Sequence, residues 1–298
     1  MRLNEQILEL GLDGSAYAAP VDGGPGIGFG EHELVSPASV MKIQIALTIE
    51  NLTAQGLMDG AERRIVPSGP RTPGPTGMSL MSDEITISVR DLVVAMLTIS
   101  DNVATDELIA LVGLDEINRT TRGLGLERTE VTSNLRDMLN DMAVEVGFED
   151  FESFADHNPE IDGAPSAKEI AERIEASAAL DPTRGSRTTA FETVKLLRAI
   201  WTDRAGEPSA CRRVRETMER QLTRNRIASG FSASTKVGAK SGALMGVVRN
   251  EAGVVALPDG SAFAIAIFTR RGNGNTTEPG IIDGVIGRVA RSLIDAIQ

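Results

Sequence analysis

The sequence predicts an α/β (α+β) fold, in which an antiparallel sheet is flanked by N- and C-terminal helices and carries an inserted all-helical domain. Three observations support this prediction. Strand-like segments gather near the two ends of the chain, the long middle has helical periodicity, and the C-terminal stretch is an amphipathic helix. We therefore expect residues 1–35 and 205–298 to form a sheet domain and residues 36–204 to form a helical domain.

The N-terminal segment is expected to supply a short helix and two strands. Residues 3–11 have the spacing of an amphipathic helix. "SAYAAPV" (15–21) is typical of a strand and "DGGPG" (22–26) of a tight turn. "IGFGEHELV" (27–35) then predicts the returning partner strand.

A helix is predicted to begin at Ser36, with Ser36 as its N-cap and Pro37 as its first residue. Gly56 is expected to end it. Its apolar residues fall near one face: Val40, Ile43, Ala46, Leu47 and Leu52. After a loop over residues 67–77, which is rich in proline and glycine, further helices are expected from about Val89 and over residues 101–113.

Residues 145–187 differ from their surroundings because they are acidic and partly aromatic, and they include a polar helix candidate. Two readings stay open for this segment: an insertion or lid near a functional site, or a solvated surface excursion. Residues 188–201 and 208–222 then have helical spacing.

Strands are predicted over residues 233–242, 249–257 and 261–270, and a "PDG" turn joins the last two. The chain ends in a helix that should pack on the sheet through one apolar face. That face consists of Ile282, Val285, Ile286, Val289, Leu293 and Ile297.

Composition excludes several classes of function. The net charge of the 298 residues is −12 and no basic patch is evident, so neither nucleic acid nor an anionic membrane is an expected partner. Cys211 is the only cysteine, so no intramolecular disulfide can form. With only His32 and His157, a histidine- or cysteine-based metal site is not expected, and we predict no metal and no cofactor.

The first residues contain no apolar run of signal-peptide length, and no stretch of 18 apolar residues occurs in the sequence. We therefore expect a soluble, cytoplasmic protein, or an exported one if a leader has been trimmed.

Three short motifs carry residues able to do chemistry. Ser39 and Lys42 form S-x-x-K near a predicted helix start, where a neutral lysine one turn along can take the serine proton. Ser100-Asp101-Asn102 forms S-D-N at a helix break, and Lys240-Ser241-Gly242 forms K-S-G on a predicted strand. Taken singly, each is better explained by structure alone: a polar helix face, an N-cap and a strand-edge turn.

Together and in this order, the three motifs form the set used by penicillin-recognising serine enzymes. The sequence resembles the class A β-lactamases and their penicillin-binding relatives, and the resemblance covers about two-thirds of the chain. It is strongest in "SPASVMKIQIAL", "ISVRDLVVAMLTISDNVATDELI" and the closing strand segments. The resemblance implies a β-lactamase-like fold and an acyl-enzyme mechanism.

The resemblance also implies a role for each matching residue. Ser39 is the acylated nucleophile, Lys42 activates it, and Ser100 passes a proton to the leaving group. The backbone N–H groups of Ser39 and Ala243 form the oxyanion hole. The residues expected to bind substrate are Asn102, Lys240, Ser241, Gly242 and Arg249. For Arg249, an exposed arginine at a strand end is the equally weighted alternative.

Two departures from the family concern deacylation. Class A β-lactamases carry an E-x-x-L-N motif whose glutamate activates the deacylating water, and no such motif occurs here. Glu130, Asp137 and Asp141 lie in the corresponding region, where solvated helix carboxylates explain them equally well. The Y-x-N motif of class C enzymes is also missing, since the single tyrosine, Tyr17, precedes the nucleophile.

The sequence thus predicts a serine hydrolase that cleaves an amide, lactam or ester through an acyl-Ser39 intermediate. The alternative is a penicillin-binding or sensing protein that is acylated, or binds its ligand, without efficient turnover. The expected partner is a small molecule with a carboxylate near the reactive carbonyl.

Overall fold

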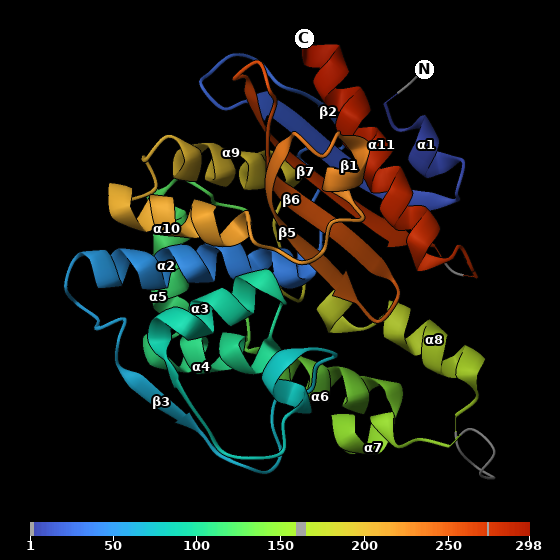
Figure 1. The fold of residues 1–298 in the computed structure, drawn as a ribbon. Helices are drawn as coiled ribbons and strands as arrows, with labels where there is room; N and C mark the ends of the chain where they lie inside the picture. The colour runs from blue at the N-terminus through green and yellow to red at the C-terminus, as the bar shows by residue number, and fades with distance from the viewer. Residues whose placement is uncertain (1–2, 159–164, 273) are drawn as a thin grey trace.

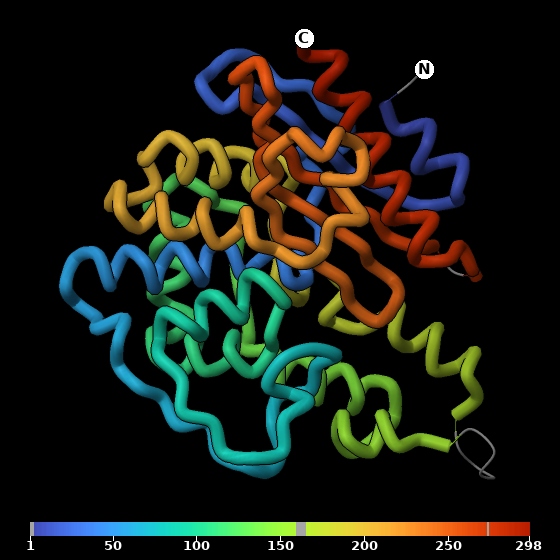
Figure 2. The backbone as a smooth tube through the Cα atoms, viewed as in Figure 1, coloured from blue at the N-terminus to red at the C-terminus, as the bar shows by residue number. Residues whose placement is uncertain are grey.

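The computed structural model of the protein describes residues 3–158, 165–272 and 274–298. At its centre is a five-stranded antiparallel sheet with the strand order β2-β1-β7-β6-β5 (Figure 1). The strands are β1 (Leu12–Pro20), β2 (Ile27–Phe29), β5 (Lys236–Leu244), β6 (Val248–Ala256) and β7 (Ala262–Arg271). Figure 2 shows the N-terminal segment running beside the C-terminal strands. The predicted sheet, assembled from both chain ends, is confirmed.

Helices cover both faces of this sheet. α11 (Pro279–Ile297) and α1 (Glu5–Leu8) pack on one face, and α9 (Ala190–Trp201) packs on the other. On α11 the predicted apolar residues are buried from Ile282 to Leu293, and only Ile297, at its end, is partly exposed. The C-terminal helix therefore packs as its spacing predicts.

The strand register sets a row of side chains across four strands. Ser15 of β1 pairs with Phe268 of β7, Phe268 with Asn250 of β6, and Asn250 with Gly242 of β5. Directly opposed residues of antiparallel strands point to the same face. This row therefore crosses the face that meets the helical part of the molecule.

The helical part is built around α2 (Lys42–Ala54), which contacts α3 (Val89–Thr98), α4 (Asn102–Val112), α5 (Leu114–Gly123) and α10 (Pro208–Met218). Every residue of α2 from Lys42 to Glu50 is buried. The sequence predicted burial of a single apolar face, but neighbouring helices bury this helix on all sides.

Shorter elements complete the fold. β3 (Arg63–Val66) and β4 (Ile85–Ser88) form a separate ribbon. The acidic segment begins at the end of α6 (Leu135–Val146) and contains α7 (Phe151–Ala155) and α8 (Ala167–Glu175). Residues 159–164 of that segment lie outside the described residues. Among the helices described, none is both long and apolar enough to cross a membrane.

Three local predictions in the N-terminal region were wrong. The predicted helix start at Ser36 is replaced by a 3₁₀ turn over Ala38–Met41, and the Ser36 hydroxyl donates to Ala179 O (3.1 Å) instead of capping. The strand predicted over residues 27–35 ends at Phe29, since Gly30 has φ +56° and turns the chain. The helix predicted over residues 3–11 is limited to α1. The division into two domains stays a prediction.

Candidate active site

Ser39 lies in the 3₁₀ turn that leads into α2, where it lines a pocket of about 60 Å³. The residue before it, Ala38, has φ +46°, a conformation that L-residues rarely adopt. The Asn250 amide holds the approach to this turn by donating to Ser36 O (3.0 Å) and Pro37 O (3.2 Å). The turn that presents Ser39 is therefore fixed by the sheet, and its unusual backbone is of the kind found at functional sites.

Lys42 is fully buried one turn after Ser39. Its Nζ donates to Ser100 O (2.7 Å), to Asn102 Oδ1 (2.8 Å) and, more weakly, to Ser100 Oγ (3.3 Å). Burial lowers the pKa of Lys42 to about 7, against the opposing pull of the Asp101 and Asp106 carboxylates. Near neutral pH, therefore, a large fraction of Lys42 is an uncharged amine able to accept a proton.

In the S-D-N segment, Asp101 stabilises the local fold, whereas Ser100 and Asn102 contact Lys42. Asp101 is the N-cap of α4, accepting from Ala104 N (3.0 Å), and it also accepts from Met78 N (2.8 Å). Ser100 has φ +60°, which turns its hydroxyl and carbonyl toward Lys42. The Asn102 amide nitrogen donates to Pro73 O (2.8 Å), so this motif also anchors the proline-rich loop.

Lys240 is the second fully buried lysine, and its Nζ donates to Ser241 O (2.7 Å). Burial lowers the pKa of Lys240 well below its usual range. The neighbouring cations Lys42 and Arg226 lower it further, while Glu251 opposes them. The structure therefore brings the lysines of the S-x-x-K and K-S-G motifs into electrostatic contact.

Gly242 allows β5 to lie directly against the Ser39 turn. A Cβ atom at this position would lie 2.7 Å from Pro37 O and 3.2 Å from Ser39 N. The Ser241 N–H donates to Gln221 at the free edge of β5, and backbone direction alternates along a strand. The Ala243 N–H therefore points from the same free edge, and both Ser39 and Ala243 line the pocket.

Arg249 is placed apart from these residues. It is the register partner of Ala243, and its guanidinium makes two hydrogen bonds to Asp283 of α11 (2.8 and 2.6 Å). Its side chain is 17% exposed, so the simple picture of an exposed arginine at a strand end does not describe it. A role for Arg249 in anchoring a substrate carboxylate stays a prediction.

The part of the Ser39 pocket that α6 supplies is apolar. α6 contributes Leu135, Met138 and Leu139, and among the described residues no aspartate or glutamate lines this pocket. The end of the acidic segment supplies Ala179 and Ser186, so part of that segment does border the site.

Of the three acids noted from the sequence, two have partners outside the pocket and the third faces solvent. Glu130 forms an ion pair with Arg187, and Asp137 accepts from the Asn134 side chain (2.7 Å). Asp141 is exposed to solvent. None of them meets Ser39 in the described structure.

Two features escaped the sequence analysis. Asp106, one turn after Asn102, accepts from Leu135 N (2.7 Å), Arg136 N (2.9 Å) and Thr72 Oγ1 (2.7 Å), and burial raises the pKa of its carboxyl. Its i+4 spacing from Asn102 on α4 was the available signal. In addition, residues 136–140 read R-x-x-L-N, the E-x-x-L-N spacing with Arg136 in the glutamate's place.

The fold, together with the way its three motifs meet around Ser39, places the protein among the β-lactamase-like proteins, the class of the class A β-lactamases and their penicillin-binding relatives. The chain belongs to the β-lactamase enzyme family (Beta-lactamase2), whose model matches residues 2–297.

The proteins similar to this chain include β-lactamases, a protein named as a β-lactamase regulator and PBP-A. A β-lactamase regulatory protein, BlaB of Streptomyces cacaoi, is 28% identical, with 99% of this chain and 96% of that protein covered. A β-lactamase of Chitinophaga pinensis has a similar structure, with TM-score 0.78, 19% identity and coverage of 100% and 98%. The structure of PBP-A gives TM-score 0.74, 20% identity and coverage of 100% and 96%.

Proposed function

We propose that the protein is a β-lactamase-like serine hydrolase that acts through an acyl-Ser39 intermediate and deacylates slowly. Its substrates are lactams, amides or esters that carry a nearby carboxylate. The observation that carries the proposal is the composition of the Ser39 pocket, which is lined by the nucleophile turn, by the edge strand β5 and by apolar residues of α6. Such a pocket is equipped for acyl transfer but offers no carboxylate to activate water.

In this proposal acylation takes the following course. The Ser39 oxygen attacks the substrate carbonyl as its proton passes to the neutral amine of Lys42. The N–H groups of Ser39 and Ala243 stabilise the oxyanion, an effect worth about 10²–10³ in rate per donor. The C–N or C–O bond then breaks, and the proton reaches the leaving atom through the Ser100 hydroxyl. The product is an ester on Ser39.

Substrate binding is assigned to Asn102, Lys240 and Ser241. One hydrogen of the Asn102 amide is used by Pro73 O, and the second is available to a substrate carbonyl. Lys240 and Ser241 are assigned the carboxylate, since they are placed on the strand that borders the pocket.

Deacylation adds water to the ester, releases the carboxylic product and restores Ser39. No residue in the described pocket wall is suited to take the water proton, so this step is expected to limit turnover. A second candidate function follows from the same wall: a ligand-sensing protein that keeps the acyl group. The name of the Streptomyces cacaoi relative, a regulatory protein, favours including this alternative.

Labelling with a fluorescent penicillin, followed by intact-mass spectrometry, tests the proposal. The protein is expected to gain one penicillin mass on Ser39 and to lose it over minutes to hours with release of hydrolysed product. Ser39→Ala is expected to abolish labelling, whereas Ser36→Ala, in the same pocket, should preserve it. A persistent adduct would favour the sensing protein, and labelling that survives in Ser39→Ala would contradict both readings.

A further inference from the structure

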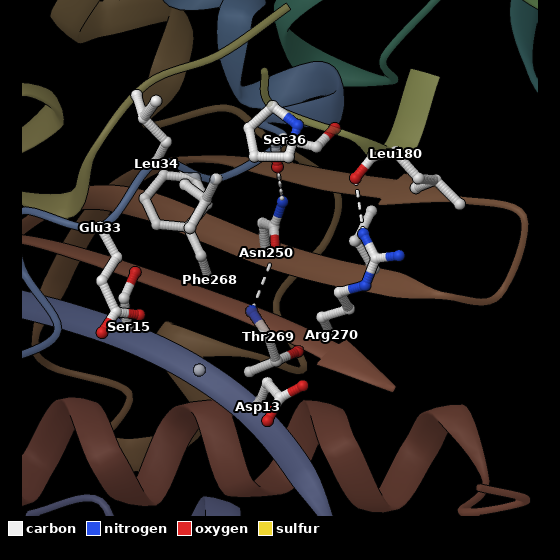
Figure 3. Close-up of a pocket in the computed structure, with 14 residues that line it drawn as sticks. Asp13, Ser15, Glu33, Leu34, Ser36, Leu180, Asn250, Phe268, Thr269 and Arg270 are labelled. Carbon is white, nitrogen blue, oxygen red and sulfur yellow. Dashed lines mark hydrogen bonds between the residues drawn. The ribbon is translucent and has the colours of Figure 1, made fainter. Parts of the chain in front are cut away.

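One buried side chain, that of Asn250 on β6, connects the sheet to the turn that presents Ser39. Its amide nitrogen donates to Ser36 O (3.0 Å) and Pro37 O (3.2 Å), and its oxygen accepts from Thr269 N (3.1 Å). Figure 3 shows Asn250 between Ser36 and Thr269, with a dashed line to each. Both amide hydrogens and the amide oxygen are thus in use. A single side chain joins β6, β7 and the chain just before Ser39.

The backbone of Ala38 gives the Pro37 contact its importance. The φ angle of Ala38 describes rotation about its N–Cα bond, so it fixes the direction of the Pro37 carbonyl relative to Ser39. This angle is +46°, a strained conformation for an L-residue. If Ala38 relaxed to a negative φ, either Pro37 O would leave the Asn250 amide or the Ser39 backbone would move. The hydrogen bond to Pro37 O therefore opposes relaxation of the turn.

Neighbouring groups confine the same carbonyl. Pro37 O also accepts from Val40 N (3.2 Å), which closes the turn around Ser39. Gly242, the register partner of Asn250, brings β5 so close that a Cβ atom there would lie 2.7 Å from Pro37 O. The carbonyl is thus held by the turn itself, by β5 and by the Asn250 amide, so the loss of one of these contacts would be transmitted to Ser39.

From this geometry we infer that Asn250 is a positioning residue for acylation: by holding the two carbonyls that precede Ala38, it keeps the hydroxyl and the N–H of Ser39 aligned with the substrate carbonyl. The inference rests on the proposed acyl-Ser39 function. Among the described residues, Asn250 lines a neighbouring cavity of about 140 Å³ and is not part of the Ser39 pocket. It therefore acts through the turn, and its effect should be on the acylation step rather than on substrate affinity.

Asn250→Ala tests the inference. Water from the neighbouring cavity can reach the freed carbonyls, so we expect the variant to fold, but water is not attached to the strand and cannot hold the turn. Stopped-flow acylation by a fluorescent penicillin at increasing concentrations gives the dissociation constant and the acylation rate constant separately. The rate constant should fall about 10²-fold, as for a misplaced nucleophile, while the dissociation constant stays close to the wild-type value and every molecule is finally labelled. Asn250→Ser, which retains a hydroxyl donor, should lie between the two.

Two further variants separate positioning from a general loss of stability. Asn118 is buried with a comparable set of contacts: its amide nitrogen donates to Val131 O (2.8 Å) and its oxygen accepts from Val131 N (2.9 Å). Asn118→Ala should therefore lose stability but acylate at the wild-type rate. Ala38→Gly removes the strain in the turn, because glycine adopts a positive φ freely. In that background Asn250→Ala should slow acylation less than it does alone.

Amide hydrogen exchange reads the turn without any acylation. Exchange of the Val40 N–H, relative to that of Ile45 within α2, should be faster in Asn250→Ala than in the wild type and unchanged in Asn118→Ala. The inference is overturned if Asn250→Ala keeps the wild-type acylation rate, if Asn118→Ala slows acylation equally, or if the relative exchange of Val40 does not change. A wild type that no penicillin acylates would contradict the proposed function alone, and faster Val40 exchange in Asn250→Ala would still support the hold on the turn.

Discussion

At the scale of single residues, the chemistry depends on two lysines that are taken out of water. Lys42 and Lys240 are both fully buried, and burial lowers both pKa values because the protein interior solvates an ammonium poorly. Lys42 still has three close acceptors around its Nζ, so it is held in place whichever protonation state it adopts. The S-x-x-K spacing alone predicted that Ser39 and Lys42 share a face. It did not predict how Lys42 is enclosed.

The pH dependence of acylation should follow Lys42. Its pKa is about 7 and the neutral amine is the base, so the acylation rate constant should rise through pH 7. Between pH 6 and pH 8 the neutral fraction, and with it the rate constant, is expected to increase roughly tenfold before levelling off. Stopped-flow acylation by a fluorescent penicillin measures this profile. A rate that is flat or falls across this range would exclude Lys42 as the base.

The Asp106→Asn variant tests whether the pKa of Lys42 sets this pH profile. The Asp106 carboxylate raises the pKa of Lys42, and asparagine keeps the shape while removing the charge. The midpoint of the acylation profile is therefore expected to move to lower pH. An unchanged midpoint would show that another group controls the profile.

At the scale of elements, the sequence predicted those helices, strands and motifs that are determined by residues close together in the chain. The three motifs, the helices from Val89 and at the C-terminus, and the closing strands all follow from local spacing and turn residues. The positive φ angles of Ala38 and Ser100 could not be predicted, since neither residue type signals them and the packed turn imposes them. The apolar α6 wall was also missed, because its place beside Ser39 depends on tertiary packing.

The contact between β5 and the Ser39 turn should tolerate no side chain at position 242. In Gly242→Ala the new Cβ would press on Pro37 O at 2.7 Å, so the strand must move away from Ser39 N. Displacing the Ala243 N–H is expected to slow acylation about 10²-fold or more, the cost of losing an oxyanion donor. Gly238→Ala on the same strand meets only side chains, those of Trp201 (3.1 Å) and Glu219 (3.2 Å), and should acylate at close to the wild-type rate. Equal rates for the two variants would contradict the role given to this contact.

The apolar wall of α6 suggests a gain of function. Met138 is partly exposed and lines the Ser39 pocket, so a glutamate there would bring a carboxylate to the acyl-enzyme at little cost in packing. Met138→Glu is expected to speed deacylation about tenfold or more by general-base catalysis. Met138→Gln, which has the same shape without the base, should leave deacylation slow. Mass spectrometry of the decaying adduct distinguishes them, and identical decay would show that the wall does not limit turnover.

At the scale of the whole molecule, strand pairing joins the two chain ends, and one buried ionic cluster ties the C-terminal helix to the sheet. Nine residues of β1 pair with β7, so the N-terminal strand lies inside the sheet formed by the C-terminal half. Asp283 of α11 accepts from Arg249 on β6 and from Arg226, which also donates to Gly242 O (2.9 Å). The C-terminal helix is thus connected to the strand that borders the active site. A sequence pattern cannot reveal such a partnership, because its members lie 34 and 57 positions apart.

This cluster should make Asp283 far more important to stability than Asp295, the other acid of α11. Asp283→Ala removes the ion-pair partner of the buried Arg226 and of Arg249, and breaking a buried pair typically costs about 3–5 kcal/mol. Asp295 on the same helix pairs with Arg291 at the surface, where both side chains are about half exposed. Asp295→Ala should therefore cost about 0–1 kcal/mol. Urea unfolding gives both free energies of unfolding.

Because Arg226 holds the Gly242 carbonyl, we also expect Asp283→Ala to slow acylation of Ser39 while Asp295→Ala leaves it unchanged. Similar stability losses in the two variants would mean that the buried cluster does not hold the C-terminal helix to the sheet.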